Sequence, residues 1–523
     1  MQAEADSRLA VADLGSNSFR LVVFETHSPE PGGLGGWWKR TDEIHEPVRI
    51  GAGVDEAGAL GADGIARALA TIEVFAHFCD AAGLAHDEID MVATSAIREA
   101  SNAEAFLEEA HRRAGRPLRV LSREEEARYG FLAAVNSSDI RDGAVLDLGG
   151  GSLQLIAVEG REAGALDSWR LGAVRMTERF LPGDGPATAD QLAALRDHVA
   201  RKLRGATWLT GAERLVGIGG TVRNLAAAVQ RAGRVPEFGV QGFVIEREAL
   251  DDLVERLAAL PACERGSVPG IKPARADIIL AGAVVVQSVL ARGDLSGIEV
   301  TEAGLREGVF FERAFGEARE PLFGTARRPV FDDVRRASVL NLAAQYDSHA
   351  AHTDHVARLA LGLFDDLAAA GLHSGDPRER ELLWAASLLH DIGVAVDYDD
   401  HHKHSRYLVL NAGLPGFSPR EVALIGQIVR YHRKGMPDPG PFAGLFQDGD
   451  AALLNRCAVL LRLGEDLERS RDQLVRSARV RADSKGPVRL ELEADGQARV
   501  ARWAASREGE LFERTFGRAL EVA

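Results

Sequence analysis

Two stretches with nearly the same residue pattern constrain the fold of this chain more than any other feature. Residues 143–158 read GAVLDLGGGSLQLIAV, which is an apolar run, a turn that contains Asp147 and three glycines, and a second apolar run. Residues 8–24 read RLAVADLGSNSFRLVVF and repeat this scheme around Asp13. One Asp-Gly turn between apolar runs is usually an ordinary β-turn. The pair instead predicts a duplicated α/β domain that closes around one phosphate-bearing ligand.

The turns have the chemistry that such a ligand requires. Glycine has no Cβ, so its backbone N–H can approach an anion closely. Asp147 stands at the end of a predicted strand, where its carboxylate can reach a metal ion carried by that anion. A third stretch, LVGIGGTVRNL at 215–225, predicts a strand, a Gly-Gly turn and a helix capped by Thr221. It indicates another anion or nucleotide cradle, although a glycine pair there can also serve only close packing.

Two charged positions between the turns are candidates for the same site. Arg98 follows a short buried strand at 90–96, and ligands gather at the carboxyl ends of strands in α/β folds. The alternative is a surface arginine at the start of a helix. Glu124, Glu125 and Glu126 begin a helix that Ser122 and Glu125 cap. Such carboxylates usually form a solvated cluster favoured by the helix dipole, but one of them can face the site as a general base.

Composition excludes several classes of protein. The formal net charge of −16 disfavours a nucleic-acid-binding protein, so any polyanion must meet a local basic lining. The three cysteines have no CxxC spacing, which argues against disulfides and thiolate metal sites. The N-terminus is acidic, unlike a signal peptide, and the longest apolar run, 278–291, is too short to span a bilayer. We therefore expect a cytoplasmic protein with no membrane insertion.

The pattern changes after a predicted linker at 318–330. The following sequence reads as wholly helical, and nine of the 15 histidines lie between 349 and 432. His352, the His390-Asp391 pair, His404 and His432 have the residue types of a site for a divalent metal. The alternative is a set of unrelated polar histidines. Two strands at 488–493 and 498–503, followed by a helix, are expected to form a small α+β tail.

Six motifs occur in an order that resembles the exopolyphosphatase / guanosine pentaphosphate phosphohydrolase family of the actin-like and sugar-kinase-like ATPase superfamily. They are DLGSNSF at 13–19, TSAIREASN at 94–102, EEAR at 125–128, DLGGGS at 147–152, GIGGTVRN at 217–224 and GLREG at 304–308. HHKHS at 401–405 and YHRK at 431–434 are similar to the long branch of this family, which carries a C-terminal HD-type domain.

The resemblance implies a role for each matching position. Glu126 would activate the attacking water, with Arg98 as a second catalytic residue, and Asp13 and Asp147 would hold Mg²⁺ or Mn²⁺. The expected phosphate-binding residues are Ser16, Asn17, Ser18, Gly149, Gly150, Gly151, Ser152, Gly219, Gly220 and Thr221. In-line attack on a terminal phosphoryl group needs an oriented water, a divalent ion and donors for the phosphate oxygens. Because a phosphoanhydride has a good leaving group, one base can suffice.

Two positions depart from the family pattern. Gln154 stands where the family commonly has a glutamate, which puts the role of a second carboxylate in doubt. The closing HD-type motif usually reads Ala-Asp, whereas this chain has GED at 464–466, so that Glu465 or Asp466 would be the last ligand. Otherwise the HD site is empty, and the domain serves as a channel wall for polyphosphate.

The predicted fold is α/β, with duplicated actin-like (RNase H-like) subdomains at 1–135 and 136–316, an all-α HD-type domain at 317–483 and a small α+β domain at 484–523. The predicted function is release of orthophosphate from the ends of inorganic polyphosphate. Hydrolysis of pppGpp to ppGpp is the nearest alternative. Others are a kinase-like phosphotransferase, an HD-domain phosphohydrolase whose N-terminal half senses phosphorylated ligands, and a binding protein without activity. The resemblance also implies a homodimer.

Overall fold

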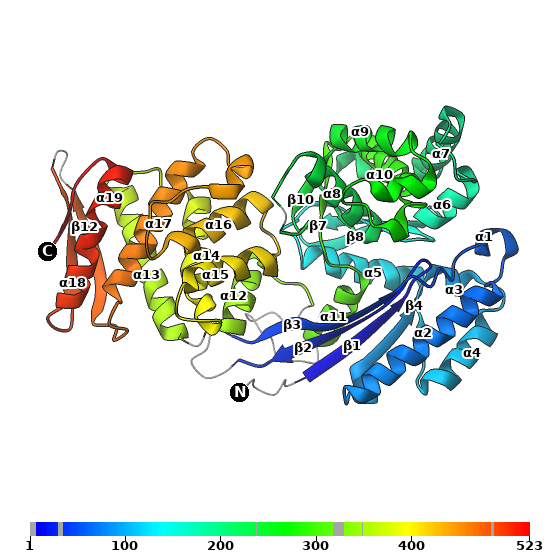
Figure 1. Ribbon diagram of the computed structural model, residues 1–523, viewed down its shortest axis with the longest axis horizontal. Helices are drawn as coiled ribbons and strands as arrows, with labels where there is room; N and C mark the ends of the chain where they lie inside the picture. Colours follow the sequence, from blue (N-terminus) through cyan, green and yellow to red (C-terminus); the bar gives the residue numbers. More distant parts are fainter. Residues whose placement is uncertain (1–6, 30–34, 237, 317–328, 348, 483–485) are drawn as a thin grey trace. The chain divides into compact units, whose positions relative to one another are not determined.

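The chain forms two compact units in a computed structural model (Figure 1). The structure describes residues 7–29, 35–236, 238–316, 329–347, 349–482 and 486–523. The first unit comprises residues up to 27 together with 38–234 and 239–334. The second comprises 28–37, 235–238 and 335–523. Most of the predicted linker at 318–330 lies outside the described residues.

The first unit contains two sheets built to the same plan. The strand order of the first sheet is β3-β2-β1-β4-β5, and that of the second is β10-β11-β9-β6-β7-β8. In each sheet an antiparallel hairpin (β1–β2 or β6–β7) adjoins a parallel strand (β4 or β9). The duplication expected from the two Asp-Leu-Gly turns is therefore present. The strands are β1 (Ser7–Leu14), β2 (Phe19–His27), β3 (Trp37–Glu46), β4 (Ile89–Ala93), β5 (Arg119–Val120), β6 (Gly143–Leu148), β7 (Leu153–Glu159), β8 (Glu162–Trp169), β9 (Leu215–Ile218), β10 (Phe243–Glu246) and β11 (Gly297–Val300).

Alternation along the hairpin strands divides their side chains between two cores. On β1, Ala10, Ala12 and Leu14 face a core that includes α2 and α4, whereas Leu9 and Val11 face a core built around α5 and α11. Strand β6 behaves likewise, and its Val145 enters the same core around α5 and α11. Both sheets thus pack against the same layer of helices, which is formed by α5 and α11. The helices of this unit are α1 (Val54–Ala57), α2 (Ala62–Ala81), α3 (Ser95–Glu99), α4 (Ala103–Ala114), α5 (Arg123–Val135), α6 (Ala173–Phe180), α7 (Ala189–Lys202), α8 (Gly220–Ala232), α9 (Arg247–Ala258), α10 (Ile279–Gly293) and α11 (Leu305–Phe315).

Helix α8 begins differently from the expectation. Its N-cap is Gly219, and Thr221 lies within the first helical turn instead of capping it. Gly219 has a φ of 102°, and a Cβ there would lie 2.8 Å from the carbonyl oxygen of Leu148. Only glycine satisfies both constraints without strain. The close approach to strand β6, which sequence spacing does not reveal, therefore decides how the helix starts.

The second unit consists of helices and a three-stranded sheet that share one hydrophobic core. Residues 498–503, expected to be a strand, instead form the N-cap and first residues of helix α18, in which Ala501, Ala504 and Ala505 are buried at helical spacing. The antiparallel partner of β13 is β12, which precedes the predicted domain boundary at 483/484. The elements are α12 (Val334–Tyr346), α13 (Ala350–Ala369), α14 (Pro377–Leu389), α15 (His401–Ala412), α16 (Pro419–Tyr431), α17 (Asp450–Leu467), β12 (Val475–Ala482), β13 (Val488–Ala494), α18 (Arg499–Ala505), α19 (Gly509–Phe516) and β14 (Leu520–Val522).

The division into four domains stays a prediction, since the described chain separates into two units. Two observations bear on it. Helix α11 follows the second sheet in sequence but packs beside β2 of the first, where Phe310 stacks on Phe24 with ring centroids 4.3 Å apart. The tail after 484 has no core of its own, because its apolar residues belong to the core of the helices. None of the helices in the described ranges is long and apolar enough to cross a membrane.

The packing of α11 against α5 predicts a sensitive position. A Cβ on Gly308 would overlap the backbone carbonyl of Tyr129, so Gly308→Ala is expected to lower the free energy of unfolding by about 1–3 kcal/mol. The matched control is Gly211→Ala, because nothing lies within 4 Å of a Cβ at that position and its φ is not positive. Urea unfolding followed by circular dichroism measures both. Equal stability of the two variants would contradict the close helix contact.

Candidate functional site

A pocket in the first unit lies where the two repeated hairpins turn. It brings together the carboxylates of Asp13 at the end of β1, Asp147 at the end of β6 and Glu126 in the first turn of α5. Asp13 is more than 100 residues from the other two in the sequence. The complete lining is Asp13, Gly15, Ser16, Asn17, Ser18, Arg20, Thr94, Ser95, Glu126, Asp147, Leu148, Gly149, Gly150, Ser152, Gly219, Gly220, Arg223, Arg275, Gly304, Leu305 and Arg306.

The glycine-rich turn after β6 fits tightly against the turn after β1. A Cβ on Gly151 would lie 2.5 Å from Ser95 Oγ and 3.0 Å from Ser16 Oγ, and those two hydroxyls are 3.1 Å apart. The carbonyl of Gly150 accepts a hydrogen bond from the N–H of Val174 at the start of α6 (2.9 Å). The turn is therefore held from both sides by backbone and short side chains.

Glu126 is buried, and both of its carboxylate oxygens have a partner. Oε2 accepts a hydrogen bond from Nη1 of Arg98 at 2.9 Å, and Oε1 accepts one from Oγ of Ser152 at 3.3 Å. Arg98 also donates to the carbonyl of Leu121 at 2.7 Å, which fixes its guanidinium. Arg98 does not line the pocket itself. Its position behind Glu126 makes it a residue that orients the carboxylate.

Gln154 completes this network from within the sheet. Its side chain is 1% exposed, and its Nε2 donates to Ser152 Oγ at 3.0 Å. Ser152 has one hydroxyl proton, so a hydroxyl that accepts from Gln154 can give that proton to Glu126. An ionised glutamate at position 154 could not donate to Ser152. Glutamine in place of the usual family glutamate thus lets the Ser152 hydroxyl accept from Gln154 and donate to Glu126.

The pKa of each of the three carboxyl groups is raised. Burial is the largest cause for Asp13 and Glu126, and it outweighs the opposing effects of Arg306 and Arg98, respectively. Burial, together with the charges of Glu126 and Asp13, raises the pKa of Asp147 to about 7. The pocket therefore concentrates negative charge that an added cation would stabilise.

The pocket also concentrates four guanidinium groups, which the sequence analysis did not assign to the site. They belong to Arg20, Arg223, Arg275 and Arg306. Burial, and then neighbouring guanidinium groups, lowers the pKa of Arg20 and of Arg275 to about 10. Three of them lie in or next to the motifs at 8–24, 217–224 and 304–308, and Arg275 lies just before the apolar run at 278–291. An arginine next to one of these motifs or to the apolar run was therefore the sequence feature that could have identified the four residues.

Most of the predicted phosphate-binding residues line this pocket, but two do not. Gly151 lines a small neighbouring cavity, and Thr221 is 1% exposed, with its methyl group directed at Gly282 of α10. Gly219 and Gly220 do line the pocket, and a Cβ on Gly220 would overlap the guanidinium of Arg275. Thr221 thus packs helix against helix, because the start of α8 turns its side chain into the core.

The donor set of the pocket fits a hard divalent cation. Mg²⁺ and Mn²⁺ prefer oxygen ligands, and Asp13 and Asp147 offer carboxylates at the ends of two strands. Asp147 forms no ion pair with any residue that the structure describes, whereas Asp13 is 3.3 Å from Arg306 Nη1. A half-buried carboxylate that forms no ion pair loses part of its hydration without full compensation. A cation beside Asp147 would supply that compensation.

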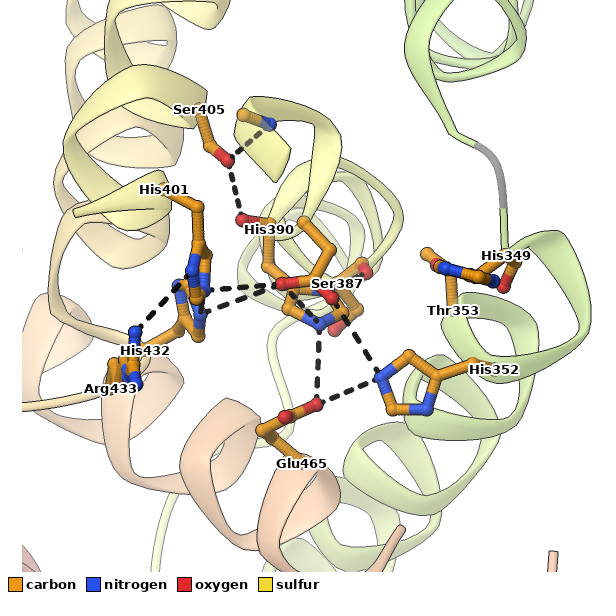
Figure 2. Close-up of polar contacts among 12 residues, drawn as sticks. His349, His352, Thr353, Ser387, His390, His401, Ser405, His432, Arg433 and Glu465 are labelled. Carbon is orange, nitrogen blue, oxygen red and sulfur yellow. Dashed lines mark hydrogen bonds and ion pairs between the residues drawn. The ribbon is translucent and has the colours of Figure 1, made fainter. Parts of the chain in front are cut away.

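The second unit contains a separate cluster of histidines and acids (Figure 2). Two groups of potential ligand atoms, each within 4.8 Å of one another, share Asp391. The first group adds His352 from α13 and His390 from the end of α14, and the second adds His401 from α15 and His432 from the end of α16. Glu465 on α17 accepts from His352 Nε2 at 3.0 Å.

His404, which the sequence analysis placed in this cluster, belongs to neither group. His401, three residues earlier on α15, occupies the position instead. The loop after α14 approaches α15 so closely that a Cβ on Gly393 would overlap the carbonyl of His401. Ser405 Oγ bonds both the carbonyl of His390 (2.6 Å) and the N–H of Gly393 (2.8 Å). This contact fixes which turn of α15 faces Asp391.

The two repeated sheets and the pocket at their hairpin turns define an α/β protein of the actin-like class. A profile of the Ppx/GppA phosphatase family matches residues 40–315, and a profile of domain III of Ppx/GppA phosphatases matches residues 334–500. The chain belongs to the Ppx/GppA phosphatase family.

Individual relatives agree with this assignment. A Vibrio cholerae serotype O1 protein named guanosine-5'-triphosphate,3'-diphosphate pyrophosphatase is 28% identical over 473 residues, which cover 88% of each chain. The solved structure of the Aquifex aeolicus family member is 27% identical, with a TM-score of 0.50 over 60% of this chain and 99% of that chain. An exopolyphosphatase from Cytophaga hutchinsonii is 22% identical, with a TM-score of 0.53 over 59% of this chain and 97% of that chain. At this identity it shows the fold alone.

The link from Gln154 through Ser152 to Glu126 predicts unequal effects of two substitutions. Gln154→Met removes one donor of an uncharged hydrogen bond and is expected to lower phosphate release less than about tenfold. Gln154→Glu places a carboxylate where it competes with Glu126 for the hydroxyl proton, so we expect a loss greater than tenfold. Initial rates of phosphate release measure both. A Glu variant as active as the Met variant would show that the direction of this link does not matter.

Proposed function

We propose that the pocket of the first unit hydrolyses terminal phosphoanhydride bonds of inorganic polyphosphate and releases orthophosphate. The observation that carries the proposal is the meeting of opposite charges in one pocket: the buried carboxylate of Glu126 and the half-buried carboxylates of Asp13 and Asp147 line it together with four guanidinium groups and two hairpin turns. Guanidinium groups that lower each other's pKa gain from a polyanion placed among them. The family assignment supports a phosphatase.

In this proposal Glu126 is the general base. Its carboxylate is oriented by Arg98 and Ser152, and its pKa is raised chiefly by burial, which makes it a stronger base than an exposed glutamate. The base takes a proton from a water that lies in line with the bond to be broken. A new P–O bond forms, the bridging P–O bond breaks, and the leaving oxygen remains on the shortened chain.

The turns and the guanidinium groups bind the phosphates. Backbone N–H groups of residues 15–18, Gly150 and Ser152, with the side chains of Ser16, Asn17, Ser18 and Ser152, surround the terminal phosphoryl group in this proposal. Gly149 shapes the turn, and Gly219 and Gly220 approach the next phosphoryl group. Asp13 and Asp147 would hold Mg²⁺ or Mn²⁺, which when bound neutralises phosphate charge. The arginines bind the polyphosphate chain and exclude competing cations from the phosphate oxygens.

The lining favours a polymer of phosphates over a nucleotide. Among the described residues that line the pocket none is aromatic, and the apolar side chains are those of Leu148 and Leu305. Burial, and then the charges of Arg20 and Arg275, lower the pKa of His45 to about 4, so the charges of these two pocket arginines act on a residue outside the lining. Hydrolysis of pppGpp is the second candidate, favoured by the name of the Vibrio cholerae relative.

The remaining alternatives predict different products or a different site. A phosphotransferase would move labelled phosphate to an acceptor other than water. A hydrolase centred on the HD-type cluster would lose activity in Asp391→Asn and keep it in Glu126→Gln. Homodimerisation remains an expectation from the resemblance, and a cytoplasmic location remains an expectation from the composition.

Removal of the base gives the central test. Glu126→Gln keeps the size of the side chain but cannot accept a proton, so phosphate release from long-chain polyphosphate with Mg²⁺ should fall by about two orders of magnitude or more. Glu124→Gln is the matched control, because Glu124 is an exposed carboxylate in the same helical turn. An active Glu126→Gln enzyme would move the chemistry elsewhere, and activity of the wild type on pppGpp alone would favour the second candidate.

The four arginines of the pocket are expected to determine how tightly the enzyme binds its substrate. Arg275→Met should raise KM for long-chain polyphosphate by about tenfold or more and change kcat less, because one charge-assisted contact is lost from binding. Arg256→Met, an exposed arginine on α9, is the control. Steady-state kinetics with polyphosphate and with pppGpp measure the effect. An unchanged KM for polyphosphate would place the phosphate chain away from this group of arginines.

A further inference from the structure

The start of helix α6 holds the glycine-rich turn that follows β6. The carbonyl of Gly149 accepts a hydrogen bond from the N–H of Ala173 at 3.0 Å, and the carbonyl of Gly150 accepts one from the N–H of Val174 at 2.9 Å. The two segments lie so close that a Cβ on Gly172 would overlap the carbonyl of Gly150. The backbone of α6 therefore fixes the first two peptide groups of the turn.

The third carbonyl of the turn accepts from a side chain instead. Nε of Arg175 lies 3.2 Å from the carbonyl oxygen of Gly151, and Nη2 of the same guanidinium lies 2.9 Å from Oε2 of Glu99. Arg175 is 7% exposed, so both contacts are made away from solvent. A guanidinium is planar and presents its N–H groups in fixed directions. The bond to Glu99 therefore directs the Nε–H of Arg175 at one carbonyl of the turn.

The direction of each carbonyl sets the direction of the N–H group that follows it. In a trans peptide the C=O and N–H bonds point to opposite sides. Arg175 holds the carbonyl of Gly151 on the side of α6, so the N–H of Ser152 points to the other side. The backbone bond from α6 to the preceding carbonyl pair has the same effect on the N–H of Gly150. Gly150 and Ser152 line the pocket of the first unit, whereas Arg175 lines the small neighbouring cavity.

The anchor of Arg175 adjoins the residue that orients the general base. Glu99 follows Arg98 in the short helix α3, and Arg98 bonds the carboxylate of Glu126 at 2.9 Å. One helix thus supports both the base and, through Arg175, the turn that meets the phosphate. A shift of α3 would displace the two together.

We propose that Arg175 is a positioning residue that aligns the N–H of Ser152 with the phosphoryl group under attack, and that Glu99 holds Arg175 in place. This role rests on the proposed function of the pocket, because it concerns the donors for the phosphoryl oxygens in that reaction. An N–H group that is fixed in advance stabilises the charge of the transition state without reorganisation. Arg175 therefore affects kcat more than KM, in contrast to the arginines that line the pocket.

Replacement of the guanidinium by an ammonium tests this role. Arg175→Lys keeps a positive charge near Glu99, but a compact ammonium cannot reproduce the fixed fork of the guanidinium. We expect kcat for phosphate release from polyphosphate to fall by about tenfold to a hundredfold, with a change in KM of less than about threefold. Arg170→Lys is the matched control and should keep the kcat of wild type. Arg170 pairs with the same oxygen of Glu99 at 2.9 Å, but its side chain is 57% exposed.

Both variants are expected to fold, which urea unfolding checks. Glu99 retains Arg170 and Arg123 as counter-charges at 2.9 and 3.5 Å when Arg175 is replaced. A second variant, Glu99→Gln, tests the anchor. Because Glu99 acts through Arg175, the double variant should have the kcat of Arg175→Lys alone. Losses that multiply in the double variant would overturn the link between the two residues.

Orthovanadate distinguishes a misaligned N–H group from a loss of folded enzyme. Its five-coordinate form resembles the phosphoryl group under attack, so its inhibition constant reports the same contacts and does not depend on the concentration of active enzyme. With Mg²⁺ present, the constant should rise by about tenfold in Arg175→Lys and stay within about twofold of wild type in Arg170→Lys. An unchanged kcat in Arg175→Lys, or a lower kcat with an unchanged inhibition constant, would overturn the role of Arg175.

Calorimetric titration with orthovanadate measures the same affinity without a substrate. A wild-type protein that binds orthovanadate but releases no phosphate from polyphosphate would contradict the proposed function alone. The affinities of wild type and Arg175→Lys then decide the role of Arg175: a difference of about tenfold supports it, and equal affinities overturn it. A wild-type protein that binds no orthovanadate would overturn the alignment of Ser152 as well.

Discussion

The close contact between two hairpin turns is the constraint on which the first unit depends. Gly150 and Gly151 lie so near Ser16 and Ser95 that side chains larger than hydrogen would push the turns apart. Because the turns touch, the strands that precede them end at one place, and Asp13 and Asp147 enter the same pocket. Helix α5 lies between the two sheets and brings Glu126 to that place. The proposed chemistry is a consequence of this contact.

Burial then sets the electrostatics of the pocket. Carboxylates that are kept from water have raised pKa values, and guanidinium groups crowded together have lowered ones. Both effects cost stability in the free protein, and both are relieved when a metal ion and a polyanion arrive. The pocket is thus organised for its ligands before they bind. The hydrogen bonds from Gln154 to Ser152 and from Ser152 to Glu126 orient the carboxylate of Glu126 without adding another charge.

The second unit uses a comparable principle with different groups. Backbone carbonyls at the ends of α14 and α16 and before α15 fix three imidazole rings, and Ser405 ties the loop that carries Asp391 to α15. Each ring is oriented by local backbone, while the convergence of the rings depends on the packing of several helices. Sequence spacing alone favoured His404, because it does not say which turn of α15 faces the loop.

The sequence by itself determined the duplicated sheets, the turns that carry Asp13 and Asp147, and the position of Glu126 at a helix start, because these depend on local patterns of apolar residues, glycines and caps. Tertiary structure decided what those patterns leave open. Packing directs Thr221 into the core and places Arg20, Arg223, Arg275 and Arg306 around one pocket. It also brings Gln154 to Ser152, and it places His401 rather than His404 beside Asp391. It also made 499–505 a helix, since the partner of β13 lies earlier in the chain. The physical reason is that side-chain partners far apart in sequence are set by packing, which local periodicity does not encode.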